Sequence, residues 1–472
     1  MRMRAALFYF CFLFFFLGKS QPVYFENRYG SSYSESSQSV QQMADGSIYI
    51  GGYSDSVSQN GVFDPSISKF DRYGNWLWTK HYSSPESDYG FYLYVLPDSK
   101  IILVGEIGLG GVNGTDAQII KTDSSGNLIW KKTFGGPYSQ SIEYVDATAD
   151  GNLIACGYTS DSTGNDVWIV KMDTAGTILW QKKLGGPLVD YSDYIKQTPD
   201  GGYISSAVTS SFGAGGTDGW LLRLDQNGDT LWTRTSGNQY SGGCQGVCAT
   251  TQGDFILYGE EETSAGSWFN FFMTKYDANG NFIWKKNFGG SGSDAIFDMF
   301  EAPDKGFYGV GYSNSYSMGP LNLIFFKTDS VGTVEWKTIY GNAGIDIGYY
   351  LIPSMDNGFL ITGSSNLPDD QYYLLHLDSL GGLTGINSPK IHDFDFFVFP
   401  NPGHDKIFIS VPSQKGKLEV EICDMNGKVY MKQDINNPAS FEIQIPPDIS
   451  SGMYFIKLKS EKGISVRKFI RD

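Results

Sequence analysis

The amino-acid sequence predicts an all-β protein, and three observations lead to this fold class. A segment of about 50 residues recurs along the chain, with four short strands and two tight turns in each copy, which is typical of β-propellers. One additional strand precedes the first complete copy. After Gly381 the repeat stops and a different alternation of apolar and polar residues begins. We therefore expect a seven-bladed β-propeller whose N-terminal strand closes the last blade, followed by a small Ig-like β-sandwich tail.

The clearest copy of the repeat runs from Tyr191 to Trp232. It reads as a strand, an Asp-Gly first turn, a strand, a Gly/Ser loop, a strand, an Asp-x-x-Gly second turn and a strand ending in Trp. The Asp of the second turn recurs, with Gly three residues later, at Asp71, Asp123, Asp173, Asp225, Asp277, Asp329 and Asp378. Trp follows six of these turns, at Trp78, Trp130, Trp180, Trp232, Trp284 and Trp336. Asp and Gly supply the conformations that tight hairpin turns require, so we interpret the turn and the Trp as parts of blade folding.

The two ends of the repeat block predict how the blades close. The seventh second turn, Asp378 to Gly381, leads into Gly-Leu-Thr-Gly instead of a Trp strand. A strand without a blade stands at the other end, at residues 23–28. Phe25 precedes Asp45 by the same interval at which Trp130 precedes Asp150, so Phe25 occupies the Trp position. We expect the N-terminal strand to complete the last blade and to remove two exposed sheet edges.

The chain divides into four predicted parts. Residues 1–20 carry two arginines, an apolar run and a small-x-small site before Gln21, which is the pattern of a signal peptide. The run has about 13 apolar residues, too few for a membrane anchor that needs roughly 20. Residues 21–386 form the predicted propeller, 387–393 a linker and 394–472 the tail. We expect no transmembrane segment in the mature chain.

The charge is distributed unevenly. The total is −16; residues 394–472 carry +1 and residues 1–20 carry +3, which leaves −20 for residues 21–393. A field of this sign repels nucleic acid and anionic lipid surfaces. It favours solubility and cationic or divalent-metal partners, and we expect no nucleic-acid partner.

The tail carries several separate motifs in a fixed order. They are Pro-Asn-Pro at 400–402, Asp-x-x-Gly at 424–427, Ser-Gly-x-Tyr at 451–454 and Arg-Lys-Phe at 467–469. In these features residues 394–472 resemble the type A C-terminal sorting domain of the type IX secretion system of Bacteroidetes. The resemblance implies export across the inner membrane by the signal peptide and passage through the outer membrane by recognition of the tail. In that family the tail is commonly removed, and the cargo is released or attached to surface lipopolysaccharide. An ordinary Ig-like binding module is the alternative.

The repeat itself has a looser resemblance. Residues 277–284 look like the repeat of pyrroloquinoline-quinone-type and outer-membrane-assembly propellers, and like Gly/Asp-rich bacterial propeller repeats that are fused to sorting tails. The ligand set that quinone enzymes need is not recognisable in this chain. Only the blade is carried over, and no active site.

No catalytic, cofactor or metal residue is assigned from the sequence. The four histidines, His81, His376, His392 and His404, are not spaced as metal ligands, and no Gly-x-Ser-x-Gly or His-Glu-x-x-His motif occurs. His376 takes a place that Lys or Arg holds in the other copies, two residues before the turn Asp, so we expect it to belong to the scaffold. Residues 225–229 resemble part of a calcium loop but lack its downstream Glu. We expect no cofactor, with calcium as a weak alternative.

The variable loops of the predicted propeller share one face. They join the second strand to the third within a blade, and one blade to the next, and they are rich in Ser, Gly, Asn and Tyr. Trp268 and Phe269 are predicted ligand contacts there, with core filling as the alternative. Glu260, Glu261 and Glu262 are candidate ligand residues for a divalent cation, with a solvated acidic patch as the alternative.

These observations favour a secreted or surface-displayed binding or scaffold module for protein or glycan. The first alternative is a polysaccharide lyase or hydrolase that uses carboxylates on the loop face. The second is a purely structural surface protein without a small ligand. The sequence does not identify the ligand, the oligomeric state, or whether the mature protein is released or attached.

Overall fold

The computed structural model describes residues 24–30, 34–55, 61–109, 114–264, 266–316, 320–366, 370–383, 396–399, 403–411, 417–424, 428–436, 440–447, 449–460 and 463–471. Every regular element in these residues is a β-strand, so the predicted all-β class is confirmed. No helix in the described part of the chain could cross a bilayer. The predicted signal peptide, the linker at 387–393 and the Pro-Asn-Pro motif lie outside the described residues.

Six four-stranded antiparallel sheets follow one another in chain order, and we number them sheets 1 to 6. Sheet 1 contains β2 (Glu35–Gln42), β3 (Ile48–Ser54), β4 (Asp64–Phe70) and β5 (Trp76–His81). Sheet 2 contains β6 (Asp88–Val95), β7 (Ile101–Gly108), β8 (Thr115–Thr122) and β9 (Leu128–Phe134). Sheet 3 contains β10 (Gln140–Ala147), β11 (Leu153–Ser160), β12 (Asn165–Met172) and β13 (Ile178–Leu184). Sheet 4 contains β14 (Asp190–Gln197), β15 (Tyr203–Thr209), β16 (Asp218–Leu224) and β17 (Thr230–Ser236). Sheet 5 contains β18 (Gly242–Ala249), β19 (Phe255–Glu262), β20 (Phe269–Tyr276) and β21 (Phe282–Phe288). Sheet 6 contains β22 (Asp294–Glu301), β23 (Phe307–Ser313), β24 (Asn322–Thr328) and β25 (Val334–Tyr340).

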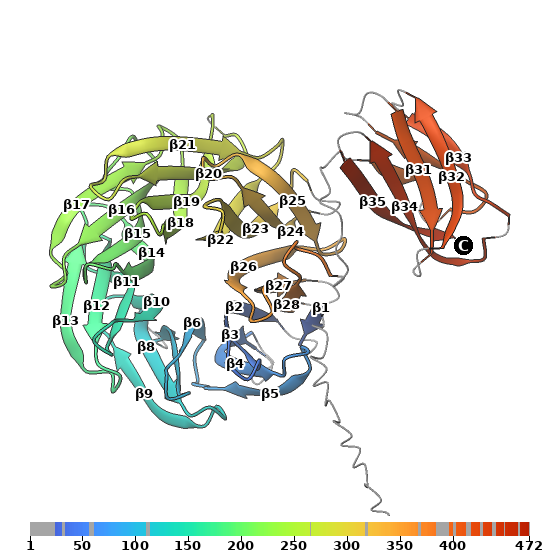
Figure 1. Cartoon of the computed structure of the whole chain (residues 1–472). Helices are drawn as coiled ribbons and strands as arrows, with labels where there is room; N and C mark the ends of the chain where they lie inside the picture. The colour runs from blue at the N-terminus through green and yellow to red at the C-terminus, as the bar shows by residue number, and fades with distance from the viewer. Residues whose placement is uncertain are drawn as a thin grey trace, which may run out of the picture.

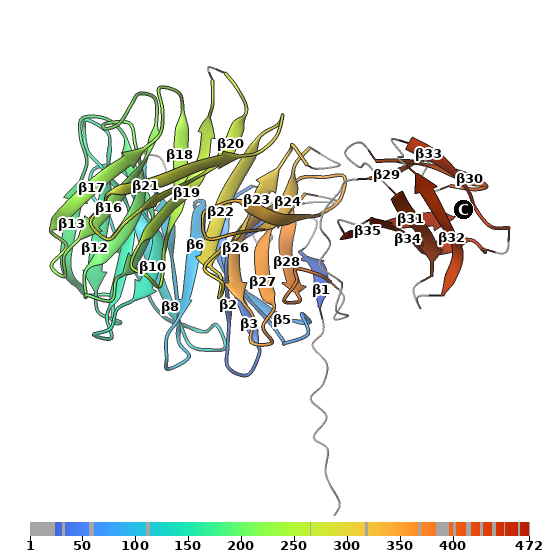
Figure 2. The same ribbon diagram turned by 45° about the horizontal axis from the view of Figure 1, so that its top comes forward.

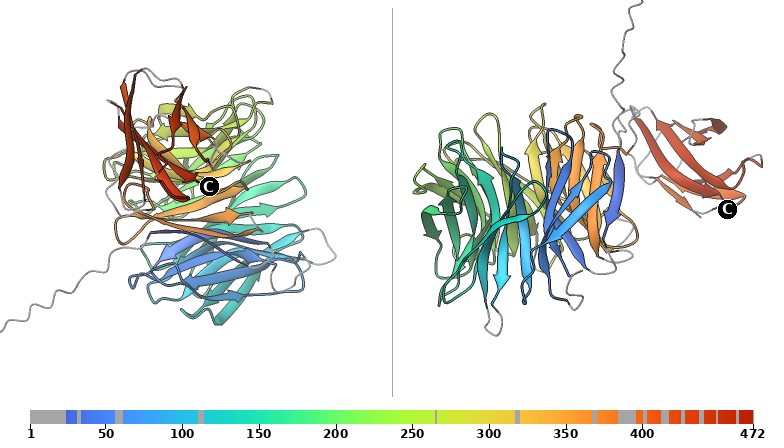
Figure 3. Two further views of the ribbon diagram at one scale, coloured as in Figure 1. Left: turned by 90° about the vertical axis from the view of Figure 1, so that its right-hand side faces the viewer. Right: turned by 90° about the horizontal axis from the view of Figure 1, so that it is seen from below.

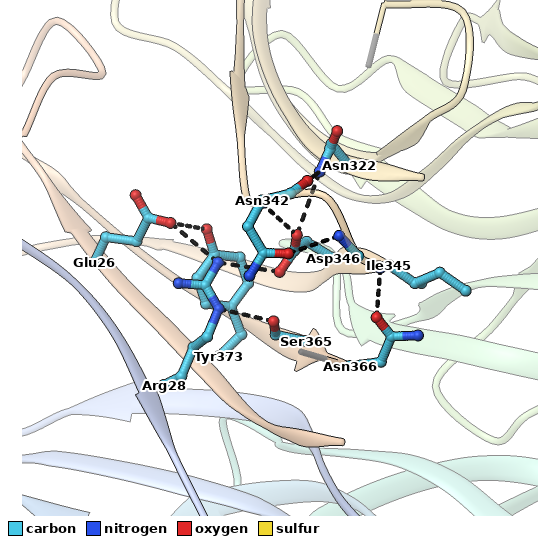
Figure 4. Close-up of polar contacts among 10 residues, drawn as sticks. Glu26, Arg28, Asn322, Asn342, Ile345, Asp346, Ser365, Asn366 and Tyr373 are labelled. Atoms are coloured by element: carbon cyan, nitrogen blue, oxygen red, sulfur yellow. Dashed lines mark hydrogen bonds and ion pairs between the residues drawn. The ribbon is translucent and has the colours of Figure 1, made fainter. Parts of the chain in front are cut away.

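Sheet 7 combines the two ends of the repeat block. Its order is β1 (Phe25–Tyr29), β28 (Gln371–Leu377), β27 (Phe359–Ser365) and β26 (Asp346–Pro353). β1 pairs antiparallel with β28, with Phe25 opposite His376, as expected for the N-terminal strand. Figure 4 shows the polar contacts at this junction: Arg28 donates to Ser365 over 2.7 Å and forms an ion pair with Asp346 over 3.1 Å. These bonds attach residues from the start of the chain to strands more than 300 residues later.

The sheets are arranged around a centre in a propeller-like way. In Figure 1 the first strands, β2, β6, β10, β14, β18, β22 and β26, surround the centre, and β5, β9, β13, β17, β21 and β25 lie on the outside. Figures 2 and 3 show that the strands run across the thickness of this ring. Sheet 1 contacts sheet 7, where Thr362 donates a hydrogen bond to Ser37 over 2.6 Å. The first strands are called inner strands below.

Each repeated Trp packs on the second-turn glycine of the following sheet. Trp180 lies against Gly228, which has φ 80°, and a Cβ atom added there would lie 2.7 Å from the Trp180 ring. The same contact joins Trp78, Trp130, Trp232, Trp284 and Trp336 to Gly126, Gly176, Gly280, Gly332 and Gly381. At the start of the ring Phe25 makes this contact with Gly74. Phe25 therefore takes the Trp position, as the spacing predicts.

The repeated basic residue pairs with the Asp of the first turn. The Nζ atom of Lys171 lies 2.6 Å from Asp150, and that of Lys327 lies 2.7 Å from Asp304. His376 makes the equivalent contact with Asp356 at 3.1 Å. The expectation that His376 belongs to the scaffold is confirmed by this geometry.

The tail forms two sheets over one core. Three strands, β29 (Phe397–Phe399), β30 (Lys406–Ser410) and β33 (Ser440–Gln444), form one sheet; β32 (Val429–Asn436), β31 (Lys417–Cys423), β34 (Gly452–Ser460) and β35 (Gly463–Arg471) form the other. Apolar side chains of both sheets, including Ile407, Val420, Ile456 and Phe469, are fully buried together. The Arg467 guanidinium lies 5.3 Å from the centre of the Phe396 ring.

Candidate functional site

All seven inner strands carry a β-bulge at the same position. In sheet 3, Ile142 pairs with Gly157 and Tyr144 pairs with Cys156, so Glu143 has no partner in the register. The unpaired residues of sheets 1 to 7 are Gln38, Phe91, Glu143, Asp193, Gln245, Phe297 and Tyr349. Each is partly exposed, whereas the residue before it on the same strand is buried in every sheet. We call these seven residues the axial ring, because the inner strands surround the centre of the molecule (Figure 1).

The bulge explains a glycine that recurs on the second strand of six of the seven sheets; sheet 4 has Ala207 at this position. A Cβ atom at Gly157 would lie 2.1 Å from the carbonyl oxygen of Ser141, so a side chain there would require the backbone to shift. The same close approach occurs at Gly52, Gly105, Gly259, Gly311 and Gly363. Bulges redirect a side chain and are common beside functional sites. The backbone of every blade is thus built to present one side chain at this position.

Four tyrosines next to the axial ring contact one another, and we call them the tyrosine belt. Tyr92, Tyr144, Tyr194 and Tyr350 each follow a ring residue directly. The Tyr92 and Tyr144 rings lie 4.1 Å apart, and those of Tyr144 and Tyr194 lie 4.3 Å apart. The hydroxyls of Tyr92 and Tyr350 meet at 2.6 Å although these residues come from sheets 2 and 7. Ser39 in the intervening sheet 1 is small enough to allow this contact.

The other side of the axial ring faces the variable loops. The inner strands begin at the connections between sheets, and these connections hydrogen-bond to the loops that follow the second strands. The amide of Ser160 donates to Ser139, and that of Ser210 donates to Val189. The axial ring therefore lies nearer to the face that the sequence predicts to be the binding face than to the face of the tight turns.

Four carboxyl groups gather at one half of the ring, which we call the acidic half: Glu143 and Asp193 belong to the ring, and Glu106 and Glu260 lie on the second strands of the neighbouring sheets. Burial raises the pKa of Glu143 to about 7, and nearby Glu106 adds to that rise. Burial and the charge of Glu143 also raise the pKa of Asp193. Burial raises the pKa of Glu260 to about 7. The pKa of Glu106 is raised mainly by burial, against hydrogen bonds from Thr115 and Tyr158 that lower it. These four carboxyls come from sheets 2 to 5.

Aromatic rings dominate the other half. The rings of Phe297 and Tyr349 lie 5.1 Å apart, and Phe297 also contacts Tyr312 at 5.8 Å. A second group on sheets 1 and 2 contains Tyr53, Phe63, Tyr89 and Phe91, with neighbouring ring centres 5.0–6.3 Å apart. Edge-to-face and offset contacts of this kind stabilise aromatic clusters. The loop side of the axial ring thus has an acidic half and an aromatic half.

The three predicted glutamates are separated by the strand. Glu260 on β19 belongs to the acidic half, and its Oε2 atom is buried without a hydrogen-bond partner in the described residues. Glu261 points to the opposite side of the sheet, where Lys285 at 2.5 Å and Asn287 hold its buried carboxylate. Glu262 contributes its backbone carbonyl to a hydrogen bond from Asn238. The run is therefore neither one cation site nor a single solvated patch.

The two predicted aromatic contacts differ in exposure. The Trp268 side chain is 63% exposed, which excludes core filling as its role. Phe269 is half-buried at the start of β20 and lies opposite Glu262 in the register. Phe269 begins β20 of sheet 5, the sheet that supplies Glu260, and Trp268 directly precedes this strand. Their proposed contact with a ligand stays a prediction.

Sequence reasoning missed the axial ring apart from the neighbouring Glu260. The available signal was the glycine that recurs at 52, 105, 157, 259, 311 and 363, because a strand glycine often marks a bulge. The bulged residue follows the residue that pairs with this glycine, and its side chain differs between the copies. A comparison of this position would have identified Glu143, and the equivalent position in sheet 4, next to the residue that pairs with Ala207, would have identified Asp193.

No group of three or more His, Cys, Asp or Glu side chains is placed to hold a metal ion in the part of the chain that the structure describes. Asp225 accepts hydrogen bonds from the amides of Asn227 and Asp229, so residues 225–229 form a turn. A hollow of about 420 Å³ lies on the rim between sheets 1 and 2, lined by Lys80, His81, Leu128 and Lys131 among others. It is separate from the axial ring and has none of its carboxyls.

Comparison with known proteins identifies the tail. Residues 397–472 match the family described as the secretion system C-terminal sorting domain. No curated protein matches the chain. The sorting domain indicates export by the type IX secretion system to the cell surface or extracellular space, and it implies an interaction with the secretion machinery.

Solved structures resemble the chain in fold alone. A polysaccharide lyase, the PL25 ulvan lyase bound to a glucuronate–rhamnose-3-sulfate ligand, has a TM-score of 0.52 at 9% identity over 76% of this chain and 97% of its own. A fungal alcohol oxidase of the AA5 family in complex with copper has a TM-score of 0.47 at 12% identity over 94% and 98%. The β-propeller domain of the trilobed protease from Pyrococcus furiosus has a TM-score of 0.43 at 10% identity over 76% and 98%.

Proposed function

We propose that this chain is a seven-bladed β-propeller of the Bacteroidetes that is secreted or displayed on the cell surface and binds a glycan at the axial ring. In this proposal residues 1–20 are a signal peptide, 21–386 the propeller, 387–393 a linker and 394–472 an Ig-like sorting tail. The seven four-stranded sheets and the contact of Phe25 with Gly74 support seven closed blades. The two-sheet core of the tail supports the Ig-like assignment.

One observation carries the binding proposal. A backbone feature that is the same in all seven sheets presents side chains that are mostly different, among them Glu143 and Asp193 in one half and Phe297 and Tyr349 in the other. If the ring served folding alone, the side chains would repeat as the Trp and Asp do. A sugar ring offers an apolar face for Phe297 and Tyr349 and hydroxyl groups for the carboxyls opposite. Binding sites commonly combine an apolar lining with a few polar groups in this way.

The binding test is a thermal-shift series on the purified protein with a panel of oligosaccharides. A ligand at a hundredfold excess over Kd stabilises the folded state by about 2.7 kcal/mol. A parallel series with calcium and with chelator tests the weaker calcium alternative. Phe297→Ala removes a ring residue, and Phe282→Ala is the matched control, because Phe282 is 62% exposed on outer strand β21. We expect a shift that Phe297→Ala abolishes and Phe282→Ala preserves; no shift with any glycan contradicts the proposal.

A second candidate function is polysaccharide cleavage. Burial raises the pKa values of Glu143 and Glu260 to about 7, which suits a general acid at neutral pH. Release of reducing ends or unsaturated products from a bound glycan, lost in Glu143→Gln, would support an enzyme. Binding without product supports the binding module.

The export role of the tail has its own test. In a strain that exports the full chain, deletion of residues 394–472 is expected to leave the protein in the periplasm. Fractionation with an antibody to the propeller measures the distribution. Surface or medium levels that match those of the full chain would contradict the role of the tail.

A further inference from the structure

The acidic half of the axial ring lacks a compensating cation. In the described residues no Lys, Arg or His forms an ion pair with Glu106, Glu143, Asp193 or Glu260. Elsewhere in the same sheets some buried carboxylates are paired with a cation, as Glu261 is with Lys285 and Asp88 with Lys131. Others, such as Asp190 and Asp294, accept hydrogen bonds from hydroxyls and backbone amides. Uncompensated buried carboxyls are costly, and the structure supplies these four with no cation.

Two of these carboxyls also lack donors. Glu260 Oε2 is buried without a hydrogen-bond partner, and Asp193 makes no side-chain hydrogen bond or ion pair among the described residues. Both residues are only partly exposed. Buried acceptors are almost always satisfied in folded proteins. These acceptors are therefore available to a ligand that brings hydrogen-bond donors.

The groups around the carboxyls are neutral. They are Tyr89, Tyr158, Tyr191, Tyr312, Cys156 and Cys244, whose pKa values are raised by burial and by these carboxyls. Lys196 influences Asp146 and Asp298 on the other side of the tyrosine belt, and not the four carboxyls of the acidic half. Nothing in this half would attract an anionic sugar.

We propose that the axial ring selects oligosaccharides with free, protonated amino groups over N-acetylated or uronic-acid oligosaccharides. This inference rests on the proposed glycan-binding function. An ammonium group brings three donors and a positive charge to Asp193, Glu143 and Glu260. The aromatic half opposite, with Phe297 and Tyr349, contacts the apolar face of the sugar ring. A uronate is repelled by the same carboxyls, and an N-acetyl group removes both the charge and two donors.

Binding of an ammonium group is coupled to proton release. The carboxyls of Glu143 and Glu260 hold protons in the free protein at mildly acidic pH, because burial raises their pKa values to about 7, and burial also raises the pKa of Asp193. Affinity for the amine therefore rises from pH 5 to pH 7 and declines again where the amine loses its own proton. An N-acetylated ligand lacks this rise.

The test is calorimetric titration of the full protein with glucosamine oligomers, N-acetylglucosamine oligomers of the same length and galacturonate oligomers. We expect the glucosamine oligomer to bind at least tenfold more tightly than the N-acetylated one at pH 7, and the galacturonate to bind least. Equal affinity for the first two overturns the inference and leaves glycan binding intact. Absence of binding by all three overturns the inference and argues against the proposed function as well.

Two variants keep the shape of the site and remove its charge. Glu143→Gln and Asp193→Asn are expected to abolish the preference for the amine and its rise with pH. Glu442→Gln, the same change on an exposed tail strand, is the matched control and is expected to keep both. Thermal unfolding of each variant confirms that it is folded. If a folded protein that carries both Glu143→Gln and Asp193→Asn retains the tenfold preference for the glucosamine oligomer, the inference is overturned.

Discussion

The outer rim and the axial ring are built from the same seven sheets, but they use the repeat differently. On the rim nearly every blade repeats the same side-chain contacts: Trp on a turn glycine, and a basic residue on a turn Asp. At the axial ring the sheets repeat only the backbone, through a bulge in all seven and a glycine on the second strand in six. The side chains there differ between neighbouring sheets. Repetition of side chains accompanies folding, and repetition of backbone alone leaves side chains available for binding.

The two regions also contribute differently to stability. The Trp contacts bury apolar surface between sheets and stabilise the fold. The acidic half of the axial ring places carboxyls where burial disfavours their charge. Sites that bind or react often reduce stability in this way. The predictions below separate the two regions by the size and sign of the effect.

The largest effect is expected on the rim. Trp180→Ala removes the ring that packs on Gly228 and opens a cavity between sheets 3 and 4. Large-to-small changes of a well-packed Trp cost about 3–5 kcal/mol, and partial exposure of Trp180 reduces this to about 2–4 kcal/mol. Chemical denaturation measures the loss. The matched control is Leu179→Ala on the same strand, 50% exposed, which is expected to change stability by less than about 0.5 kcal/mol. Equal effects of the two variants would contradict a structural role for the repeated Trp.

The next largest effect on stability is expected at the acidic half. There, removal of a charged side chain is expected to stabilise the folded protein, whereas Trp180→Ala destabilises it. The pKa of Glu143 is about 7 in the folded protein, against about 4.3 in an unfolded chain. Between these values the folded protein binds more protons, so stability falls as pH rises through this window. Water that reaches the ring screens the charge, and we expect a loss on the order of 1–2 kcal/mol for this group. Denaturation at pH 5 and pH 8 measures it.

Glu143→Gln sharpens this result. The variant is expected to be more stable than the parent protein at pH 8 and similar at pH 5, because it cannot become charged. Glu442→Gln is expected to leave the pH dependence unchanged. If the Glu143→Gln protein is less stable than the parent protein at pH 8, the carboxylate stabilises the fold. In that case Glu143 would contribute to stability as the rim residues do.

A smaller loss is expected in the tyrosine belt, which lies between the two regions. Tyr92→Phe removes the hydroxyl that meets the Tyr350 hydroxyl at 2.6 Å and keeps the ring contacts with Tyr144. A buried neutral hydrogen bond contributes about 0.5–1.5 kcal/mol, and we expect a loss of that size by denaturation. No loss would mean that packing of the rings alone holds the belt.

The repeat made the rim predictable and left the axial ring hidden. The Trp and the turn Asp recur as identical letters at fixed spacing, and the structure places them in the same contact in each blade. Glu143 and Asp193 occupy a position whose backbone geometry recurs in every sheet but whose residue type changes. A search for repeated residues therefore does not detect this position. Glu260, Glu261 and Glu262 form one candidate site in the sequence because they are adjacent. Successive residues of a strand point to opposite faces, so Glu260 reaches the ring and Glu261 does not.

The smallest effect on stability is expected at Trp268, outside both regions. Its side chain is 63% exposed, and the hydrogen bond that Asn270 donates to Trp268 uses the backbone carbonyl, which survives substitution. Trp268→Ala is therefore expected to change the free energy of unfolding by less than about 0.5 kcal/mol. As a ligand contact in the loop before β20 of sheet 5, it is expected to contribute to glycan affinity, with a loss of about tenfold, or 1.4 kcal/mol, in calorimetric titration. A loss of affinity without a loss of stability would extend the binding surface from the axial ring onto the loop face. Unchanged affinity would confine binding to the ring, where the backbone of all seven sheets already directs one side chain each.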